Sequence, residues 1–259
     1  MKSFDPAASI EGWLHPICSA AIQSALLVQK SNNIYGNSLE IGVYFGKTLA
    51  YLVCDQNEQE ITFGIDPFKI QYPNKPGNEA IDFQQKTISN IKSLREKNHI
   101  KGKTILIKGF SNEEKVISQL DQYQGTFRVI SIDGSHRHVD VISDLLWANR
   151  LANENALILV DDFCNSLNPE VTSAVKEFLC NTSEGREWHI SFAITPFCSP
   201  RQASTRIFLS KTNSKLDYKE LITQQLLNIQ FETSEYSLED YVIFHPDFFG
   251  SNCNLFIPK

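Results

Sequence analysis

The sequence predicts an α/β fold built on a mostly parallel sheet of seven strands, with helices on both faces. Short apolar runs alternate with longer segments whose apolar residues recur at helical spacing, which is typical of successive strand and helix units. The chain has 259 residues, of which 42% are hydrophobic and 21% charged, so it can bury one large core. It contains no internal repeat, low-complexity tract or linker. We therefore expect one main domain.

Five apolar runs are the strands predicted first. They are Ser38–Val43, Ile61–Asp66, Thr104–Lys108, Phe127–Asp133 and Ala156–Asp161. The helices predicted between them are Thr48–Cys54, Glu79–Lys97, Asn112–Gln122 and Val139–Leu151. Crossovers of this kind are right-handed, which places helices on both faces of a parallel sheet.

The two ends of the chain add further elements. Pro16 is suited to the first turn of a helix whose buried stripe would be Ile17, Ala21, Ala25 and Val28. After the fifth strand we expect a helix at Val171–Leu179, strands at His189–Thr195 and Thr205–Leu209, and a helix at Tyr218–Ile229. The aromatic-rich stretch Tyr236–Phe256 has no clear period.

Charge and cysteine content narrow the class of partner. The chain has 30 Asp and Glu against 24 Lys and Arg, which argues against a nucleic-acid or anionic-membrane surface. Its 6 cysteines are scattered without metal-type spacing, so we interpret them as reduced thiols of a cytoplasmic protein. Polar residues interrupt the apolar stretch Leu14–Val28, so we expect neither a signal peptide nor a membrane span. The expected partner is a small molecule.

Ligands of an open parallel sheet bind at the carboxyl ends of its strands. The first strand leads into Glu40-x-Gly42-x-x-x-Gly46, a glycine turn that lets a ligand approach the backbone. The turn lacks the middle glycine of the dinucleotide fingerprint GxGxxG. Asp66 ends the second strand, about 20 residues later, where a carboxylate can accept both hydroxyls of a ribose. The alternatives are a tight turn for the glycines and a helix cap for Asp66.

Carboxylates also end the fourth and fifth strands, at Asp133 and at Asp161 with Asp162. If these strands are neighbours, each like-charge pair at ~4 Å would cost roughly 4 kcal/mol at an effective dielectric of about 20, so a cation is expected among them. Oxygen ligands favour Mg²⁺, with Mn²⁺ or Ca²⁺ as alternatives. His136 could accept a proton from a substrate hydroxyl, with His138 as the fallback. Alternatively, the carboxylates cap turns or hold a ligand amine, and His136 is a solvated histidine at a helix start.

In this order, from Leu39 to Phe178, the motifs resemble class I S-adenosylmethionine-dependent methyltransferases, particularly the metal-dependent macrocin and mycinamicin type of sugar O-methyltransferase. The matching elements are Glu40-x-Gly42-Val43-x-x-Gly46-x-Thr48, Asp66, Lys108-Gly109-Phe110-Ser111, Asp133-Gly134-Ser135-His136, Val160-Asp161-Asp162-Phe163, and Pro169-Glu170-Val171 through Phe178. The resemblance implies a Rossmann-like sheet of order 3-2-1-4-5-7-6 with an antiparallel last strand. Around the matching segment we expect an N-terminal helical cap or lid (1–37), a cofactor-binding domain (38–211) and a C-terminal extension that is a lid or oligomer contact (212–259).

The resemblance further implies a role for each motif residue. The methionine part of S-adenosylmethionine would be lined by Glu40, Gly42, Gly46 and Thr48, its ribose held by Asp66, and its adenine placed near Ser111. Magnesium would be bound by Asp133, Asp161 and Asp162. His136 would be the general base, and Asp133 would also take part in cofactor binding and catalysis.

The expected reaction is methyl transfer to a hydroxyl of a sugar-containing or polyphenolic small molecule of the natural-product type. A divalent cation chelated by two neighbouring hydroxyls lowers the pKa of one of them, and His136 removes its proton. Two alternatives stay open, a Rossmann-type NAD or nucleotide-sugar oxidoreductase and a non-catalytic cofactor-binding subunit. Aromatic residues could cover the acceptor, although for most we expect a core or subunit contact; they are Trp13, Tyr35, Phe163, Phe197 and those after 212. We expect a homo-oligomer.

Overall fold

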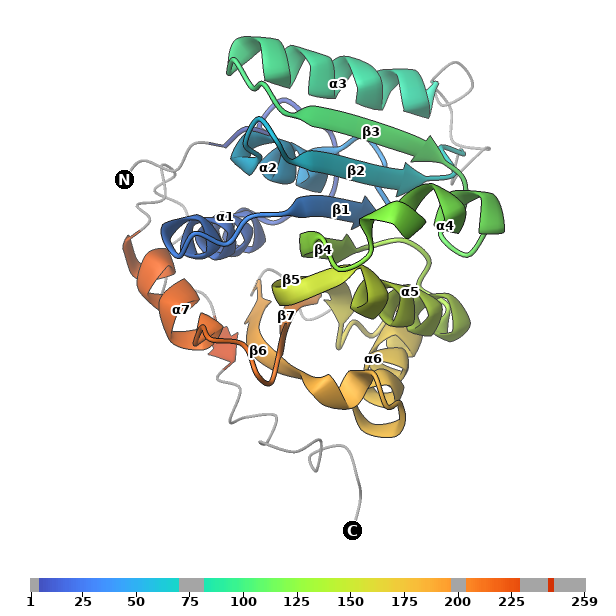
Figure 1. Ribbon diagram of the computed structural model, residues 1–259, viewed down its shortest axis with the longest axis vertical. Coiled ribbons are helices and arrows are strands. Elements are labelled where there is room, and N and C mark those ends of the chain that lie inside the picture. Colours follow the sequence, from blue (N-terminus) through green and yellow to red (C-terminus); the bar gives the residue numbers. More distant parts are fainter. Residues whose placement is uncertain (1–4, 70–81, 197–203, 229–241, 245–259) are drawn as a thin grey trace.

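The computed structural model describes residues 5–69, 82–196, 204–228 and 242–244. Eight strands form one sheet in the order β3-β2-β1-β4-β5-β7-β6-β8 (Figure 1). The strands are β1 (Asn37–Ile41), β2 (Ile61–Asp66), β3 (Lys103–Lys108), β4 (Phe127–Ile132), β5 (Ala152–Phe163), β6 (Trp188–Thr195), β7 (Thr205–Lys211) and β8 (Val242–Phe244).

The topology confirms the predicted seven-strand order. Strands β1 to β5 pair in parallel, whereas β7 pairs antiparallel with both β5 and β6. This is the Rossmann-like order 3-2-1-4-5-7-6 with an antiparallel last strand. The short β8 adds to the edge of β6 and was not predicted, because the stretch Tyr236–Phe256 around it shows no period.

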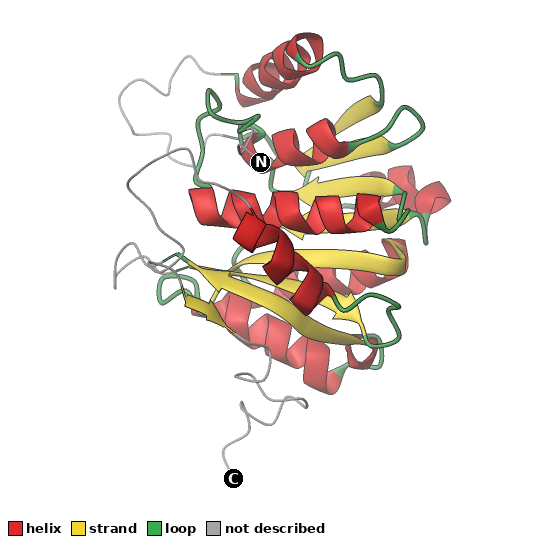
Figure 2. Ribbon diagram, turned by 90° about the vertical axis from the view of Figure 1, so that its left-hand side faces the viewer, coloured by secondary structure: helices red, strands yellow, loops and turns green. Residues whose placement is uncertain are grey.

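Helices cover both faces of the sheet, as predicted. They are α1 (Pro16–Ser31), α2 (Lys47–Asp55), α3 (Phe83–Lys97), α4 (Glu114–Leu120), α5 (His138–Leu151), α6 (Pro169–Asn181) and α7 (Tyr218–Asn228), with short 3₁₀ turns at Asp121–Tyr123 and Gly185–Glu187. One core cluster joins the sheet to α1, α2, α3 and α7, and the other joins it to α4, α5 and α6. Figure 2 shows these two helical layers on either side of the sheet.

The N-terminal helix α1 packs directly on the sheet. It begins at Pro16 as predicted, with His15 as the N-cap residue. Its predicted apolar stripe is buried, and the helix lies against α2, α7 and β6. The helix of the predicted cap 1–37 therefore belongs to the same core as the sheet.

Some predicted boundaries shift. The third helix begins at Phe83, while Glu79, the start predicted for it, lies outside the described residues. Strand β5 extends past both predicted ends, from Ala152 to Phe163, and carries a register shift between Val160 and Phe163. That irregularity falls on the two consecutive aspartates of the predicted site.

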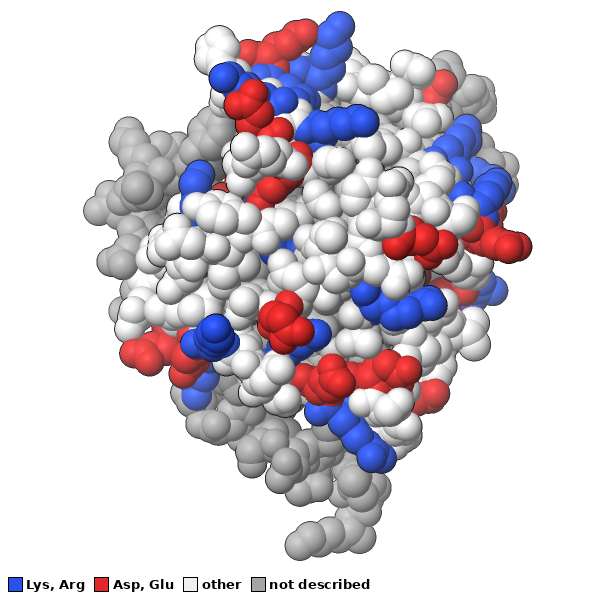
Figure 3. Space-filling model, in the orientation of Figure 1, with Lys and Arg blue, Asp and Glu red and all other residues white. Residues whose placement is uncertain are grey.

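No helix among the described segments has both the length and the apolar content to span a bilayer. Figure 3 shows Lys and Arg side chains interspersed with Asp and Glu on one face of the molecule. Among the described residues on that face, the charges form no broad patch of a single sign.

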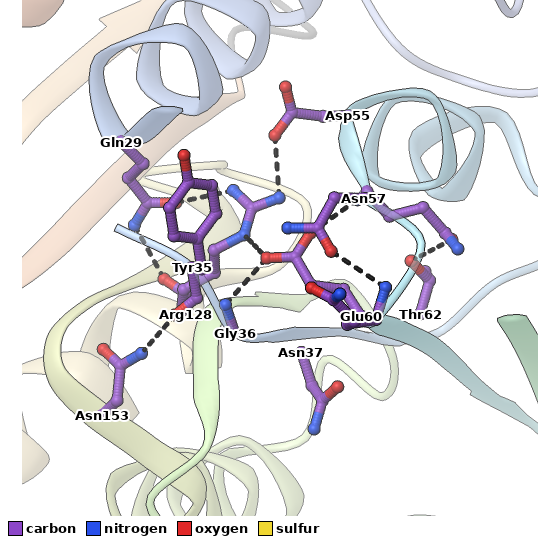
Figure 4. Close-up of polar contacts among 12 residues, drawn as sticks. Gln29, Tyr35, Gly36, Asn37, Asp55, Asn57, Glu60, Thr62, Arg128 and Asn153 are labelled. Carbon is purple, nitrogen blue, oxygen red and sulfur yellow. Dashed lines mark hydrogen bonds and ion pairs between the residues drawn. The ribbon is translucent and has the colours of Figure 1, made fainter. Parts of the chain in front are cut away.

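A buried arginine stabilises the amino end of the sheet (Figure 4). Arg128 of β4 lies 2.7 Å from Asp55 Oδ2 and 3.2 Å from Glu60 Oε1. Its Nη1 also donates to Gln29 Oε1 of α1 at 3.0 Å. Removing one partner of a buried ion pair of this kind lowers the stability of the fold by roughly 3–5 kcal/mol. The network therefore ties α1, α2 and β4 together at the end of the sheet opposite the predicted site.

Candidate active site

The glycine turn after β1 is wedged between the ends of β2 and β4. Gly42 has a φ of 89°, and a Cβ added to it would lie 1.9 Å from the carbonyl oxygen of Asp133. Its N–H donates to Ile65 O at 2.9 Å. Gly46 has a φ of 87° and is the N-cap residue of α2. Both glycines therefore occupy left-handed backbone positions that residues with a Cβ adopt at a cost.

Asp66 ties this turn to the end of β2. Its Oδ2 accepts from the N–H of Tyr44 at 2.8 Å, and its Oδ1 accepts from the N–H of Phe68 at 2.5 Å. Burial raises the pKa of Asp66, although these backbone donors oppose the shift. Each carboxylate oxygen has a second lone pair, so the residue can still accept a ligand hydroxyl. Its predicted ribose contact stays a prediction.

Glu40 is a buried carboxyl group below the same turn, with 1% of its surface exposed. Burial, with nearby Asp133 and Asp66, raises its pKa well above the ordinary value. Its Oε2 has no hydrogen-bond partner among the described residues. Because buried polar atoms are nearly always paired, this oxygen is suited to a ligand donor. Thr48 is buried in the first turn of α2.

Ser111 follows β3 and hydrogen-bonds to Asp144 of α5. Asp144 is 2% exposed, and burial raises its pKa to about 7. Asp144 was not predicted from the sequence. The available signal was an acidic residue at a buried helical position, beside the apolar Val141 and Leu145 of the same helix.

Strands β4 and β5 are parallel neighbours, as the predicted acidic site requires. Ligand atoms of Asp133, His136 and Asp162 lie within 4.8 Å of one another. His136 Nε2 is 2.9 Å from Asp162 Oδ2 and 4.0 Å from Asp133 Oδ1. These two carboxylates raise the pKa of His136 to about 10. As long as both carboxylates face it, the imidazole is therefore protonated at neutral pH.

Asp162 receives most of the hydrogen bonds in this cluster. It has a φ of 58°, and it accepts from the amides of Asn165 at 2.6 Å and Asn168 at 2.9 Å and from the hydroxyl of Ser204 at 2.9 Å. Burial opposes its ionisation, but hydrogen bonds from His136, Asn165 and Ser204 hold its pKa below the usual value. None of the two asparagines and the serine was predicted from the sequence. Their only signal is that polar residues follow the strand end.

Asp161 faces a buried arginine. Arg206 of β7 is fully buried and donates from Nη2 to Asp161 Oδ2. The same nitrogen lies 3.7 Å from Asp133 Oδ2. Burial and Asp161 raise the pKa of Asp133 to about 7, while His136 and Arg206 oppose the shift. The structure thus brings all three predicted carboxylates to one place but turns Asp161 toward a guanidinium.

Arg206 was not predicted from the sequence either. It lies at the second residue of a strand that was predicted from its apolar residues, and a charged residue there is usually solvated. His138, the predicted fallback base, instead faces α6, where its Nε2 is 3.2 Å from Glu177 Oε2.

The predicted lid residues separate into different environments. Trp13 is 75% exposed, and its ring lies 5.2 Å from that of Tyr44 in the glycine turn. Phe163 is buried in the core, as expected for most of these aromatics. Tyr35 lies at the amino end of the sheet, where its carbonyl oxygen accepts from Asn153 Nδ2 at 3.3 Å (Figure 4). Phe197 lies outside the described residues.

Comparison with known proteins relates the central part of the chain to a family model. Residues 39–163 match the family model described as a methyltransferase domain, and every predicted site residue lies within that span. No curated protein matches the chain. This central part of the chain is therefore similar to a methyltransferase domain.

Two solved structures share the fold. The O-methyltransferase from Bacillus cereus in complex with SAH is 17% identical, with 80% of this chain and 87% of that chain covered and a TM-score of 0.52. CalS11, a TDP-rhamnose 3'-O-methyltransferase of calicheamicin biosynthesis, is also 17% identical, with 74% and 81% covered and a TM-score of 0.50. At this identity the likeness concerns the fold.

Proposed function

We propose that this protein is an S-adenosylmethionine-dependent O-methyltransferase that methylates a hydroxyl of a sugar-containing or polyphenolic small molecule with the assistance of a divalent cation, foremost Mg²⁺. One observation carries the proposal. The turn at Gly42 lies directly against the backbone of Asp133, and Asp133 shares a cluster with His136 and Asp162. A cofactor at the turn would thus be next to the groups that hold and deprotonate an acceptor.

The groups at the turn suit the amino-acid end and the ribose of S-adenosylmethionine. The unpaired Oε2 of Glu40 suits the ammonium of its amino-acid end, and the free lone pairs of Asp66 suit its ribose hydroxyls. Gly42 and Gly46 leave the backbone open to close approach, and Ser111 would lie near the adenine. When bound, this cofactor supplies an electrophilic methyl group on a sulfonium.

The acidic cluster fits a hard divalent cation. Asp133 and Asp162 offer carboxylate oxygens, and the predicted third carboxylate, Asp161, is adjacent in the chain. Magnesium prefers oxygen ligands and keeps open positions for water or substrate hydroxyls. A cation there would lower the pKa of a chelated hydroxyl, which favours a vicinal diol as acceptor.

His136 is the group that would take the proton. Its pKa is raised by the carboxylates of Asp133 and Asp162, so it can act as a base only when their charge is engaged elsewhere. The imidazole then titrates near neutral pH, which suits proton transfer from a hydroxyl. Asp133 would position both the cation and the acceptor beside the cofactor turn.

The acceptor class is proposed from the same chemistry. A sugar or a catechol carries the neighbouring hydroxyls that such a cation binds, and CalS11, which shares the fold, is a sugar O-methyltransferase. We place the enzyme in natural-product biosynthesis of the macrocin and mycinamicin type and in the cytoplasm. Its partners would be a small-molecule acceptor and copies of itself, without nucleic acid or membrane.

Activity with and without metal tests this function. The purified chain should methylate members of a panel of nucleotide sugars and catechols, EDTA should suppress the product detected by mass spectrometry, and Mg²⁺ should restore it. His136→Ala should lower kcat by about 10²-fold or more and leave the affinity for SAH nearly unchanged. His138→Ala is the matched control, because that imidazole faces α6.

Three outcomes would contradict the proposal. Tighter binding of NAD than of SAH in calorimetry would favour the oxidoreductase. Full activity in EDTA would show that the reaction does not need a metal ion. Turnover unaffected by His136→Ala would show that His136 is not the general base.

A further inference from the structure

We propose that Arg206 is a built-in counter-ion of the acidic cluster and that Asp161 anchors it, so that Asp133 and Asp162 are the carboxylates left for a divalent cation. The inference rests on the proposed function, because it concerns the cation which that function requires. It departs from the ligand set that the sequence predicts, which includes Asp161.

The contacts of Asp161 carry the first step. Its Oδ2 accepts from Arg206 Nη2, and its Oδ1 is 3.4 Å from the hydroxyl of Ser204. Both oxygens therefore already face donors within the protein. A cation that took the second lone pair of Oδ2 would lie beside the guanidinium, and the two positive charges would repel each other.

The burial of Arg206 keeps the guanidinium beside Asp161. The side chain is fully buried, and its Nε and Nη1 have no hydrogen-bond partner among the described residues. Asp161 is its closest counter-charge, and Asp133 stands farther off, at 3.7 Å. Separating a buried ion pair leaves an uncompensated charge, which strongly destabilises a fold. Asp161 therefore stays paired with Arg206, because separating them would leave the buried guanidinium without a counter-charge.

Asp162 is placed differently, although it is the next residue. Its contacts are with the partly exposed His136 and with the neutral side chains of Asn165, Asn168 and Ser204. These groups carry no buried positive charge that a cation would leave unpaired. The His136 imidazole, with 42% of its side-chain surface exposed, can move toward solvent.

Formal charge supports the same division. Three carboxylates and one guanidinium leave a charge of minus two, which one divalent cation balances when His136 is neutral. Without Arg206 the cluster would keep one further negative charge. Arg206 therefore matches the cluster to a divalent cation and a neutral base.

Binding of Mn²⁺ to the full chain, followed by electron paramagnetic resonance, tests the inference. The double variant Asp161→Asn with Arg206→Met removes a neutral pair and keeps the net charge. We expect it to bind Mn²⁺ within about threefold of the wild-type Kd. Asp162→Asn should weaken binding more than tenfold.

The buried pair at the other end of the sheet provides the control. Asp55 lies 2.7 Å from the buried Arg128, so Asp55→Asn with Arg128→Met also removes a buried pair, away from the cluster, and it takes from Glu60 its arginine partner as well. This variant should leave Mn²⁺ binding unchanged. Any loss caused merely by removing a buried pair would appear in it as well.

Loss of Mn²⁺ affinity in the Asp161 and Arg206 double variant equal to that in Asp162→Asn would overturn the inference. If this double variant does not fold, Asp161→Asn with Arg206→Gln replaces it, because it also removes both charges, and a loss as large as that in Asp162→Asn again contradicts the inference. A wild-type chain that binds no Mn²⁺ contradicts both the inference and the metal in the proposed function. If instead Mn²⁺ binds as expected and no acceptor is methylated, only the proposed function fails.

Discussion

Gly42 lies so close to Asp133 that a Cβ on the glycine would be 1.9 Å from the aspartate's carbonyl oxygen. This contact joins the proposed cofactor turn on β1 to the acidic cluster at the end of β4. A change in one is therefore expected to disturb the other. The variants below separate this coupling from general effects on stability.

Substituting Gly42→Ala should disrupt the turn. The added methyl collides with backbone atoms of Asp133, which cannot move without displacing the cluster. We expect the affinity for SAH to fall at least tenfold and the melting temperature to drop, as measured by calorimetry and thermal unfolding. Gly125→Ala is the control, because Gly125 has a φ of 70° but no atom within 4 Å of an added Cβ. Its cost should be only the roughly 1–2 kcal/mol of left-handed strain, with SAH binding unchanged.

Substituting Glu40→Gln should weaken the amino-acid end of the cofactor site. The unpaired oxygen of Glu40 is replaced by an isosteric amide, which supplies less negative charge to an ammonium. We expect a loss of about tenfold or more in SAH affinity and little change for 5'-methylthioadenosine, which lacks that end. If calorimetry shows that both ligands lose the same affinity, Glu40 does not contact the amino-acid end of the cofactor. The fold should tolerate the change. Burial raises the pKa of the Glu40 carboxyl group and so opposes its ionisation, and a neutral amide of the same shape suits the same environment.

His136 should make stability depend on pH in the metal-free protein. Asp133 and Asp162 raise its pKa to about 10, above the value of about 6.5 in an unfolded chain. Its stabilising effect is thus fully present below about pH 6.5 and is lost as the pH rises through about 10. The difference in unfolding free energy between the wild type and His136→Gln should shrink from pH 6 to pH 10 in urea titrations. A difference that stays constant over this range would show that the imidazole is not paired with the carboxylates.

Asp144→Asn should stabilise the protein at alkaline pH. Burial raises the pKa of Asp144 to about 7, so ionisation of this carboxyl group costs stability increasingly up to about pH 7 and fully above it. The neutral amide avoids that cost, on the order of 1–4 kcal/mol, and the gain should be smaller at pH 5 than at pH 8. Urea unfolding at the two pH values measures it. Ser111→Ala, which removes a hydrogen bond to the ionised form, should shift stability at pH 8 in the opposite direction.

Much of the fold could be predicted because its signals are local. The spacing of apolar residues in each segment indicates a strand or a helix. The alternation of strands with helices indicates that the strands run parallel. Gly42 is visible in the sequence because a glycine after a strand marks a close approach of the backbone. The short strand Val242–Phe244 could not be predicted in this way, because it is formed by pairing with β6 rather than by a period of its own.

The sequence by itself determined that Asp133, Asp161 and Asp162 end strands at the same edge of a parallel sheet. That they meet follows from the pairing of β4 with β5, which the tertiary structure shows. Only the tertiary structure decided which way each one faces. The left-handed backbone at Asp162 and the antiparallel pairing that places Phe163 opposite Thr205 bring Arg206 to Asp161 and His136 to Asp162. The physical reason is distance along the chain: Arg206 comes from a strand 45 residues after Asp161, and a contact over that separation exists only once the sheet has formed.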